Sequence, residues 1–406
     1  MRNPMGVLLA LLFVAAAVGI AFQVGRPGRG VAAVTGSLVS RVPAQDPTQE
    51  PAADARPRWK PLWSLRLALP ESIAISNDGR RVVVRDRRNR FTAIDGILGR
   101  PVWTTPPLPR VREMAVADTG AVCCWAPLDP QADGIAVLDP ATGVQSLIRI
   151  GIPIWSVALA PGGRFAWVGC GDRTLRRFAL SGEPESVTTL PGIPDAIVAT
   201  NRAIFAGMWL DSGLAGVSPE GKPLWTVARS DPARRWRPFA TGDGRNAWVV
   251  SASGPGRKDP RMERIDPATG TTLWEKPFDG EGLRWAVAGS SGWIAVSERS
   301  QPGDVAKLHV VDLEGAWRVR GKGSRFLEPV VMAVSARGDR ITILDGERGM
   351  VTLDDRGRTI SRRMTLPKDP ATQTSPRPAR WTGNPDGTRL LVLGENGVAT
   401  LYASLP

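Results

Sequence analysis

The sequence predicts an all-β fold, a β-propeller in which four-stranded blades repeat around a ring. Turn signals recur along the chain at intervals of roughly 38 to 49 residues, which is the period of one four-stranded blade. No long helical periodicity follows residue 24, and 44 glycines and 36 prolines provide the many turns that such a ring requires. We therefore expect most of the 406 residues to form one large repeating domain.

The first turn of each predicted blade follows a short apolar segment such as Ile73–Ile75 or Met332–Val334. Glycine, asparagine and aspartate tolerate the backbone conformations of tight turns, so each signal indicates a hairpin between two strands. All but one of the turns contain glycine. The turns are Asn77-Asp78-Gly79, Asp118-Thr119-Gly120, Pro161-Gly162-Gly163, Thr200-Asn201, Gly242-Asp243-Gly244, Ser290-Ser291-Gly292, Ala336-Arg337-Gly338 and Asn384-Pro385-Asp386-Gly387.

A second turn follows in each unit except the last. It is clearest in Asp95–Gly99, Asp139–Gly143 and Asp266–Gly270, where aspartate can bond its own backbone and glycine accepts a positive φ. Several units then place a tryptophan four residues after the glycine. These tryptophans are Trp103, Trp225 and Trp274. A large aromatic side chain at a fixed strand position is expected to fill the gap between neighbouring blades.

The two ends of the repeat region predict how the ring closes. Lys60-Pro61-Leu62-Trp63 matches Lys222-Pro223-Leu224-Trp225, which is the fourth strand of a unit. Val398–Tyr402 reads as a third strand that has no fourth strand after it. The sequence thus predicts eight four-stranded blades, with the last blade closed by the N-terminal strand, which removes an open sheet edge. The alternative is a seven-bladed ring in which the weak fourth unit is absorbed elsewhere.

The pattern Asp-x-x-Thr-Gly-x-x-x-Trp, complete at Asp266–Trp274, resembles the repeat of quinoprotein-like (PQQ-type) propellers. Gly171–Leu175 looks more like a WD40 repeat. The resemblance covers nearly all of residues 60–404 and implies a propeller, but the motif specifies a blade and no activity. An enzyme of this family would also need a Ca²⁺ site and a catalytic aspartate beside the quinone, and no such cluster is inserted between the blades.

Three segments organise the chain. Residues 1–25 contain an uncharged stretch, 3–25, long enough to cross a bilayer as one helix, so we expect an N-terminal transmembrane anchor or signal segment. A cleaved signal peptide and a buried soluble helix are the alternatives. Residues 26–58 read as a flexible Pro/Ala/Gly-rich tether, and residues 59–406 form the propeller. The expected location is the membrane, with a single-pass anchor and an extracytoplasmic propeller.

The formal net charge of +13 would draw the ring towards anionic lipid or an anionic polymer. The densest basic stretch, 80–90, makes Arg85, Arg87 and Arg88 the candidate contacts for such a polyanion. A nucleic acid is not an expected partner, because single strands need aromatic platforms and the tryptophans are expected to pack between blades.

Candidate catalytic groups are few. Cys123 and Cys124 follow a turn directly and fall on the second strand of a blade, as does Cys170 in the next unit, so all three are expected in the core. His309, the only histidine, lies on a predicted third strand and cannot form a multi-histidine metal site. The sequence therefore predicts no catalytic residues, no metal site and no cofactor, and it does not favour an enzyme.

One end of the central channel offers a candidate binding surface. The position eight residues before each first-turn glycine should lie where the chain enters the innermost strand of a blade. The fourth unit has no turn glycine and is left out. A mixture of charge and indole at this end would suit a ligand or a protein partner. These positions hold Glu71, Arg112, Trp155, Trp236, Arg284, Val330 and Ala379, and the candidate residues are the first five together with Arg380 and Trp381 beside Ala379.

These observations predict a membrane-tethered, non-catalytic β-propeller that serves as a platform for a protein partner or ligand in the cell envelope. Two alternatives remain. One is a PQQ-type quinoprotein dehydrogenase, and the other is an electrostatic binder of anionic polymer or lipid.

Overall fold

The structure is a computed structural model, and it describes residue 59 onwards with gaps. The expected anchor and tether, 1–58, lie outside the described residues. The other residues left out are 109–110, 128, 130–133, 161, 183, 210–212, 229–233, 241–245, 254–257, 280–283, 288–293, 299–306, 324–328, 335–339, 346–348, 355, 357, 365–377, 384–387, 395 and 405–406. Within the described part, no helix is long and apolar enough to cross a membrane.

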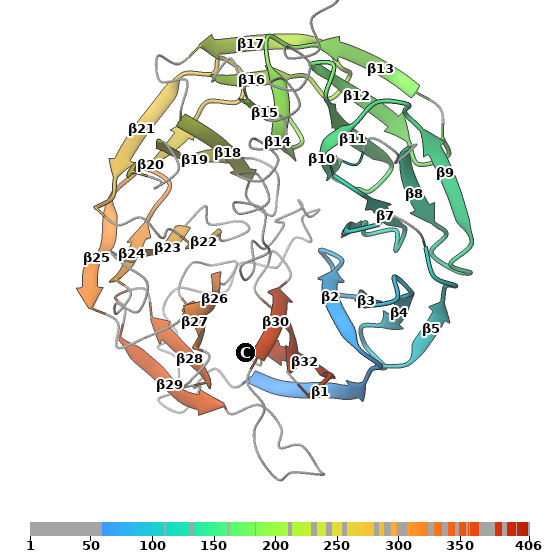
Figure 1. Cartoon of the computed structure of the whole chain (residues 1–406). Helices are drawn as coiled ribbons and strands as arrows, with labels where there is room; N and C mark the ends of the chain where they lie inside the picture. Colours follow the sequence, from blue (N-terminus) through green and yellow to red (C-terminus); the bar gives the residue numbers. More distant parts are fainter. Residues whose placement is uncertain are drawn as a thin grey trace, which may run out of the picture. The chain divides into compact units, whose positions relative to one another are not determined.

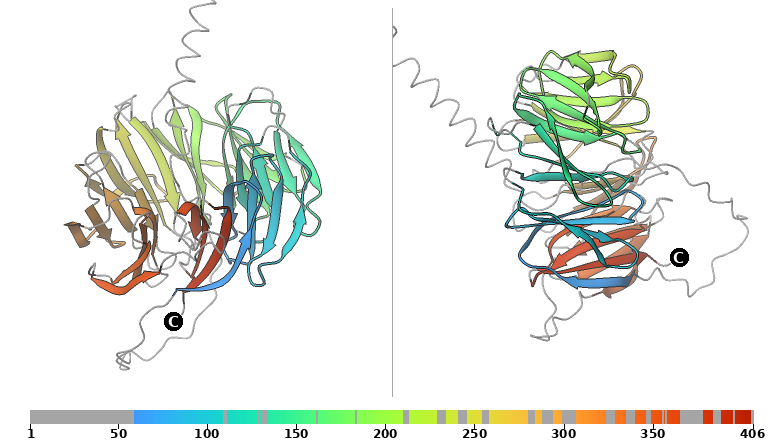
Figure 2. Two further views of the ribbon diagram at one scale, coloured as in Figure 1. Left: turned by 60° about the horizontal axis from the view of Figure 1, so that its bottom comes forward. Right: turned by 90° about the vertical axis from the view of Figure 1, so that its right-hand side faces the viewer.

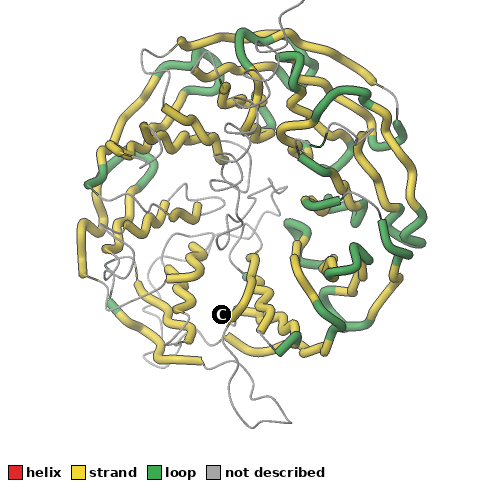
Figure 3. Tube along the Cα trace, in the orientation of Figure 1, coloured by secondary structure: helices red, strands yellow, loops and turns green. Residues whose placement is uncertain are grey.

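The described residues form strands and loops (Figure 3). The strands make eight four-stranded antiparallel sheets. In chain order the strands are β1 (Trp59–Arg66), β2 (Pro70–Ile75), β3 (Arg81–Asp86), β4 (Phe91–Asp95), β5 (Pro101–Thr104), β6 (Glu113–Val116), β7 (Val122–Trp125), β8 (Gly134–Leu138), β9 (Gln145–Arg149), β10 (Ile154–Leu159), β11 (Phe165–Cys170), β12 (Thr174–Ala179), β13 (Pro184–Thr189), β14 (Ile193–Ala199), β15 (Ile204–Trp209) and β16 (Gly213–Val217). The second half continues with β17 (Pro223–Ala228), β18 (Arg234–Ala240), β19 (Ala247–Ser253), β20 (Lys258–Ile265), β21 (Thr272–Pro277), β22 (Arg284–Val287), β23 (Ile294–Glu298), β24 (Lys307–Val311), β25 (Trp317–Gly323), β26 (Pro329–Val334), β27 (Arg340–Asp345), β28 (Gly349–Asp354), β29 (Thr359–Met364), β30 (Pro378–Gly383), β31 (Arg389–Gly394) and β32 (Val398–Ser404).

Seven of these sheets use four consecutive strands, beginning with β2–β5 and ending with β26–β29. In each, the first strand lies nearest the centre of the ring and the fourth lies on the rim (Figures 1 and 2). The weak fourth unit of the sequence forms a full sheet, β14–β17. An all-β propeller is therefore confirmed.

The remaining sheet joins the two ends of the ring. Its strand order is β1-β32-β31-β30, and β1 pairs antiparallel with β32, Trp59 opposite Ser404 and Arg66 opposite Val398. The prediction that the N-terminal strand completes the last blade is confirmed. A closed ring leaves no sheet face exposed at a seam, so the apolar faces of the first and last sheets cover each other.

Apolar clusters hold neighbouring sheets together around the ring. Cys124 and Val83 share one such cluster between β2–β5 and β6–β9, and Cys123 and Val168 share the next, between β6–β9 and β10–β13. The pattern continues to the closing sheet, where Leu391 packs with residues of β2–β5. Alternation along each strand explains this arrangement, because successive side chains face the sheet on either side.

Four tryptophans near the rim join one blade to the next. Each indole packs on a turn glycine of the neighbouring blade and donates its Nε1–H to a backbone carbonyl oxygen of the same turn. The donor–acceptor distances are 3.1 Å from Trp63 to Gly96, 3.1 Å from Trp103 to Pro140, 2.9 Å from Trp225 to Pro267 and 3.0 Å from Trp274 to Leu313. The prediction that tryptophan fills the space between blades is confirmed at these positions.

Candidate functional site at the mouth of the channel

The innermost strands define two ends of the central channel. Each of them runs in the same direction, because every sheet repeats the same antiparallel order. We call the end at which these strands begin the mouth. The turns from a first to a second strand and from a third to a fourth strand lie at the opposite end. The seven predicted mouth residues lie on or directly before the first four residues of an innermost strand, as the repeat predicted.

Several innermost strands carry a β-bulge close to the mouth. The pairing register shifts around Glu71 in β2, around Trp155 in β10 and around Asp195 in β14. A bulge inserts one residue without a partner opposite it and turns its side chain away from the regular alternation. Bulges therefore help to aim the side chains of these positions at the mouth.

Asp195 was missed by the sequence analysis. Its repeat has no turn glycine, so the count of eight residues back from that glycine had no starting point. Asp195 corresponds to Glu71 and Trp155 because it is the residue at the bulge of its innermost strand. Trp209, the last residue of β15, lies on a second strand, so a count along the innermost strands does not reach it.

Three consecutive sheets bring aromatic and charged side chains together at the mouth. Trp155 from β10 and Trp209 from β15 are both partly exposed, with ring centroids 4.6 Å apart and planes inclined by 38°. The guanidinium carbon of Arg235, from β18, lies 4.9 Å from the centroid of Trp209. Both distances are typical of attractive contacts with an aromatic face. We call Trp155, Trp209, Arg235 and Asp195 the mouth cluster.

Asp195 brings a carboxylate to this cluster. Its Oδ2 lies 3.6 Å from Nη1 of Arg235, and its side chain is 19% exposed, against 44% for Arg235. Burial raises the pKa of the Asp195 carboxyl, whereas the positive charges of Arg237 and Arg235 act in the opposite direction. Arg237 is exposed, and it lies on the same face of β18 as Arg235. Two guanidinium groups thus face one carboxylate, and the local charge is positive.

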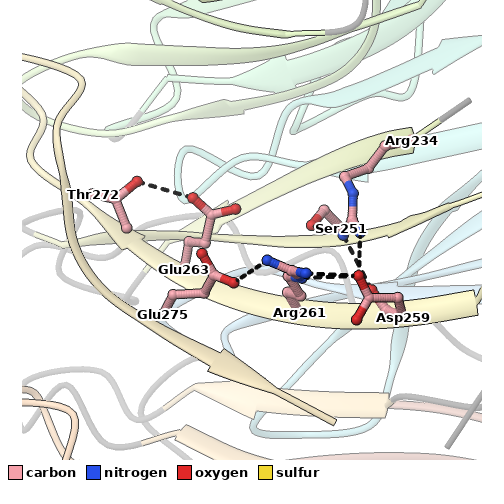
Figure 4. A network of polar contacts seen from close by, with 7 residues as sticks. All are labelled: Arg234, Ser251, Asp259, Arg261, Glu263, Thr272 and Glu275. Atoms are coloured by element: carbon pink, nitrogen blue, oxygen red, sulfur yellow. Dashed lines mark hydrogen bonds and ion pairs between the residues drawn. The ribbon is translucent and has the colours of Figure 1, made fainter. Parts of the chain in front are cut away.

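A polar network fixes the first residues of β18 (Figure 4). Arg234 is 8% exposed and donates to Oγ of Ser251 at 2.9 Å and to Oδ2 of Asp259 at 2.9 Å. Arg261 donates to the same Asp259 oxygen at 2.8 Å and to Oε1 of Glu275 at 2.6 Å. The network spans all four strands of this sheet, so it holds the backbone beside Arg235 in place.

A second sector of the mouth contains an ion pair. Arg85 is 8% exposed, and its Nη2 lies 3.3 Å from Oε2 of Glu71. It also donates to Oγ of Ser72 at 3.0 Å, to Oδ1 of Asn89 at 2.8 Å and to the carbonyl oxygen of Val111 at 3.2 Å. The sequence made Arg85 a candidate contact for a polyanion. It is instead a buried structural cation, because its side chain, one residue before the end of β3, reaches the Val111 carbonyl oxygen and is covered by the neighbouring segment.

The other predicted residues have varied surroundings. Arg87 and Arg88 are exposed, as is Arg112. Trp236 is 4% exposed and packs in the apolar cluster between β14–β17 and β18–β21, so its indole does not form part of the open surface. Arg380, on β30, is partly exposed. The pKa of the Glu113 carboxyl is raised by the protein atoms around it although the residue keeps exposed surface, and the charges of Arg85 and Arg380 oppose this.

Arg284 and Trp381 lie on β22 and β30, near the mouth end of each strand. Their side chains lie outside the described residues.

The cysteines lie in the core, as predicted. Cys123 and Cys124 on β7 and Cys170 on β11 are free thiols with no exposed surface. Burial raises the pKa of Cys123 to about 12 and that of Cys170 to about 11. A thiol that stays protonated is neither a nucleophile nor a metal ligand at neutral pH.

His309 lies on the third strand β24 and is 7% exposed. Its Nε2 lies 2.7 Å from Oε2 of Glu298, which is itself 2% exposed. The rings of Phe278 and Trp317 each lie 5.4 Å from the imidazole. Burial lowers the pKa of His309, whereas Glu298 raises it. This pair lies in the joint between β18–β21 and β22–β25, beside Phe278 and Trp317.

In the described part of the chain, no group of three or more histidine, cysteine, aspartate or glutamate side chains could hold a metal ion. The mouth cluster combines two indole faces, guanidinium groups and one carboxylate. Such a set can bind a ligand by stacking and by charge-assisted hydrogen bonds.

Comparisons with known proteins show the fold of the chain and do not show its family or activity. No protein-family model matches the chain, and no curated protein matches it. The C-terminal WD40 domain of Sif2 matches with a TM-score of 0.58 and 11% identity, over 86% of this chain and 98% of that one. The computationally designed Ika8 protein matches with a TM-score of 0.59 and 15% identity, over 84% and 99%.

A structure described as the eukaryotic initiation factor matches with a TM-score of 0.55 and 13% identity, over 83% of this chain and 88% of that one. At such identities a structural likeness shows the fold alone. These likenesses confirm the β-propeller fold that the repeat patterns predicted.

Proposed function

We propose that this protein is a non-catalytic binding platform that holds a protein partner at the mouth of its channel. The mouth cluster carries the proposal, because it gathers partly exposed Trp155 and Trp209 with Arg235 from three separate sheets. Tryptophan and arginine are the residues most enriched at the energetic centres of protein interfaces. A buried network behind Arg235 holds it in place before a partner arrives, which lowers the entropic cost of binding.

The proposal includes a membrane tether and a location in the cell envelope. Its support is the uncharged stretch 3–25 and the Pro/Ala/Gly-rich segment 26–58 that follows it. Protease added to cells with an opened outer envelope should digest the propeller if it lies outside the cytoplasm. Full protection of a membrane-bound protein would contradict that location, without bearing on binding at the mouth.

Site-specific photo-crosslinking tests the platform. A photoreactive amino acid replaces Trp155 at the mouth in the full-length protein in cells. The matched control replaces Leu98, which is 63% exposed on a turn at the opposite end. We expect one discrete crosslinked protein from position 155 and not from position 98.

Equal crosslinking from both positions, or none from position 155 when position 98 reacts, would contradict a binding role of the mouth.

The enzyme alternative is tested separately. The full-length protein is titrated with PQQ and Ca²⁺, and a bound-quinone absorbance with turnover of an alcohol would replace the platform proposal.

A further inference from the structure

The mouth cluster also has a chemical preference, and this inference rests on the proposed function. We propose that the cluster binds an acidic peptide segment that carries an aromatic side chain next to its carboxylates. Trp155 and Trp209 would take the aromatic ring, and Arg235 would take a neighbouring carboxylate. The occupant is a segment of a protein partner, and the following observations favour it.

The aromatic part follows from the indole pair. Trp155 and Trp209 belong to different sheets and meet at a centroid distance of 4.6 Å, yet both retain exposed surface. Trp236 and Trp103, by contrast, are buried, at 4% and 8% exposure. An exposed indole pair costs solvation unless a ligand covers it, and a planar ring is the best cover for an indole face.

The acidic part follows from the charges. Asp195 approaches Nη1 of Arg235 at 3.6 Å, and a guanidinium group has five N–H donors, so the 44% exposed side chain of Arg235 can donate to a ligand as well. Arg237 adds a second positive charge on the same face of β18. Asp195 offsets one of the two charges, and the net positive charge that remains suits a carboxylate. The whole chain, at +13, steers acidic partners in the same direction.

The size of the cluster favours a peptide over a nucleic acid. Single-stranded nucleic acids follow a basic groove across several nucleotides, with successive bases stacked on aromatic platforms. The described residues here offer one indole pair and two arginines around one carboxylate. This is enough for one ring and one or two acidic groups, which is the scale of a few peptide residues.

The test uses a fluorescein-labelled random copolymer of glutamate and tyrosine as the probe. Its binding to the purified full-length protein is followed by fluorescence anisotropy at low salt. Polyglutamate lacks the rings, a lysine–tyrosine copolymer has the opposite charge, and oligo(dT) tests a nucleic acid. We expect the glutamate–tyrosine copolymer to bind about tenfold more tightly than polyglutamate, and we expect weaker binding at higher salt.

Four variants of the cluster assign the binding to its residues. Trp155→Ala and Arg235→Gln should each weaken the copolymer about tenfold, and Trp155→Tyr should retain much of the affinity. Asp195→Asn removes the carboxylate that competes with the ligand, so it should strengthen binding several-fold. A general loss of structure could not produce such a gain. The matched charge control is Arg100→Gln, an exposed arginine at the opposite end, which should change affinity less than twofold.

Three results would overturn the proposal. Polyglutamate could bind as tightly as the copolymer, Arg100→Gln could weaken binding as much as Arg235→Gln, or oligo(dT) could bind through Trp155 in place of the copolymer. If a partner protein still crosslinks at position 155, none of these results would contradict the proposed function as a binding platform. Loss of that crosslink would contradict the proposed function itself, so the two failures can be distinguished.

Discussion

Two kinds of joint connect neighbouring blades near the rim. In the joint between β2–β5 and β6–β9, Trp103 is 8% exposed, packs on Gly143 and bonds the Pro140 carbonyl oxygen. In the next joint, Leu147 is the equivalent residue and is 42% exposed. A Cβ placed on Gly182, the glycine it would face, meets no atom within 4 Å. The same fold thus tolerates a joint without an indole, because the inner apolar cluster already connects those two sheets.

The joint after that shows an intermediate solution. Ser186 occupies the tryptophan position and approaches Gly221 closely, and Thr188 donates to the Gly221 carbonyl oxygen at 2.6 Å. A hydroxyl here provides the hydrogen bond that the indole Nε1–H provides elsewhere. The tryptophan contributes both buried apolar surface and a hydrogen bond to the joint. The joint with Ser186 and Thr188 shows that the hydrogen bond can be kept when the apolar surface of the indole is absent.

The largest effect should come from deleting a docked indole. Trp103→Ala removes a buried side chain and its hydrogen bond, and we expect the free energy of unfolding to fall by about 4 kcal/mol. Leu147→Ala at the undocked joint is the control and should cost less than about 1 kcal/mol, because that side chain is largely exposed. Urea denaturation followed by circular dichroism measures both. Equal losses would show that the two joints do not differ in strength.

A methyl group on a docking glycine should have the next largest effect. In Gly270→Ala the new Cβ would lie 2.5 Å from the indole of Trp225, in addition to the strain of a φ of +73°. We expect a loss of about 3 kcal/mol. Gly162→Ala has a similar φ of +84° and open space around it, so its loss of about 1 kcal/mol reports the backbone strain alone. Similar losses in the two variants would contradict tight docking at Gly270.

The smallest effect should be a gain. Leu147→Trp introduces an indole where the space beside Gly182 is open, and we expect the free energy of unfolding to rise by about 1 kcal/mol. Thermal unfolding of the variant against the parent protein measures the change. A lower melting temperature would show that this joint has a different shape and not merely a missing side chain.

Much of the fold was predictable because the repeat is local. Each repeat signal depends on a few adjacent residues. Examples are the turn Asp266–Gly270, the tryptophan four residues after Gly270, and the predicted third strand Val398–Tyr402. A glycine with positive φ or a proline in a turn acts within the chain segment that contains it. Ring closure followed from matching Lys60–Trp63 with Lys222–Trp225, which is again a comparison of short segments.

The candidate site was predictable only in part. Counting within the repeat correctly placed Glu71 and Trp155 at the mouth end of the channel, but it gave no sign that Trp236 is buried. Arg85 reads as one arginine of a basic run, and its four contacts come from residues on several separate segments. Burial of this kind depends on the neighbouring sheet, which a single strand does not reveal.

The sequence by itself determined the repeat, the closure of the ring by its N-terminal strand and the positions of the docking tryptophans. These features need only local backbone preferences and alternation along a strand. Only the tertiary structure decided that Trp155, Trp209 and Arg235 meet, and that Asp195 joins them through a bulge. Their contacts join side chains of three sheets, and the curvature of the ring and the bulges set those distances.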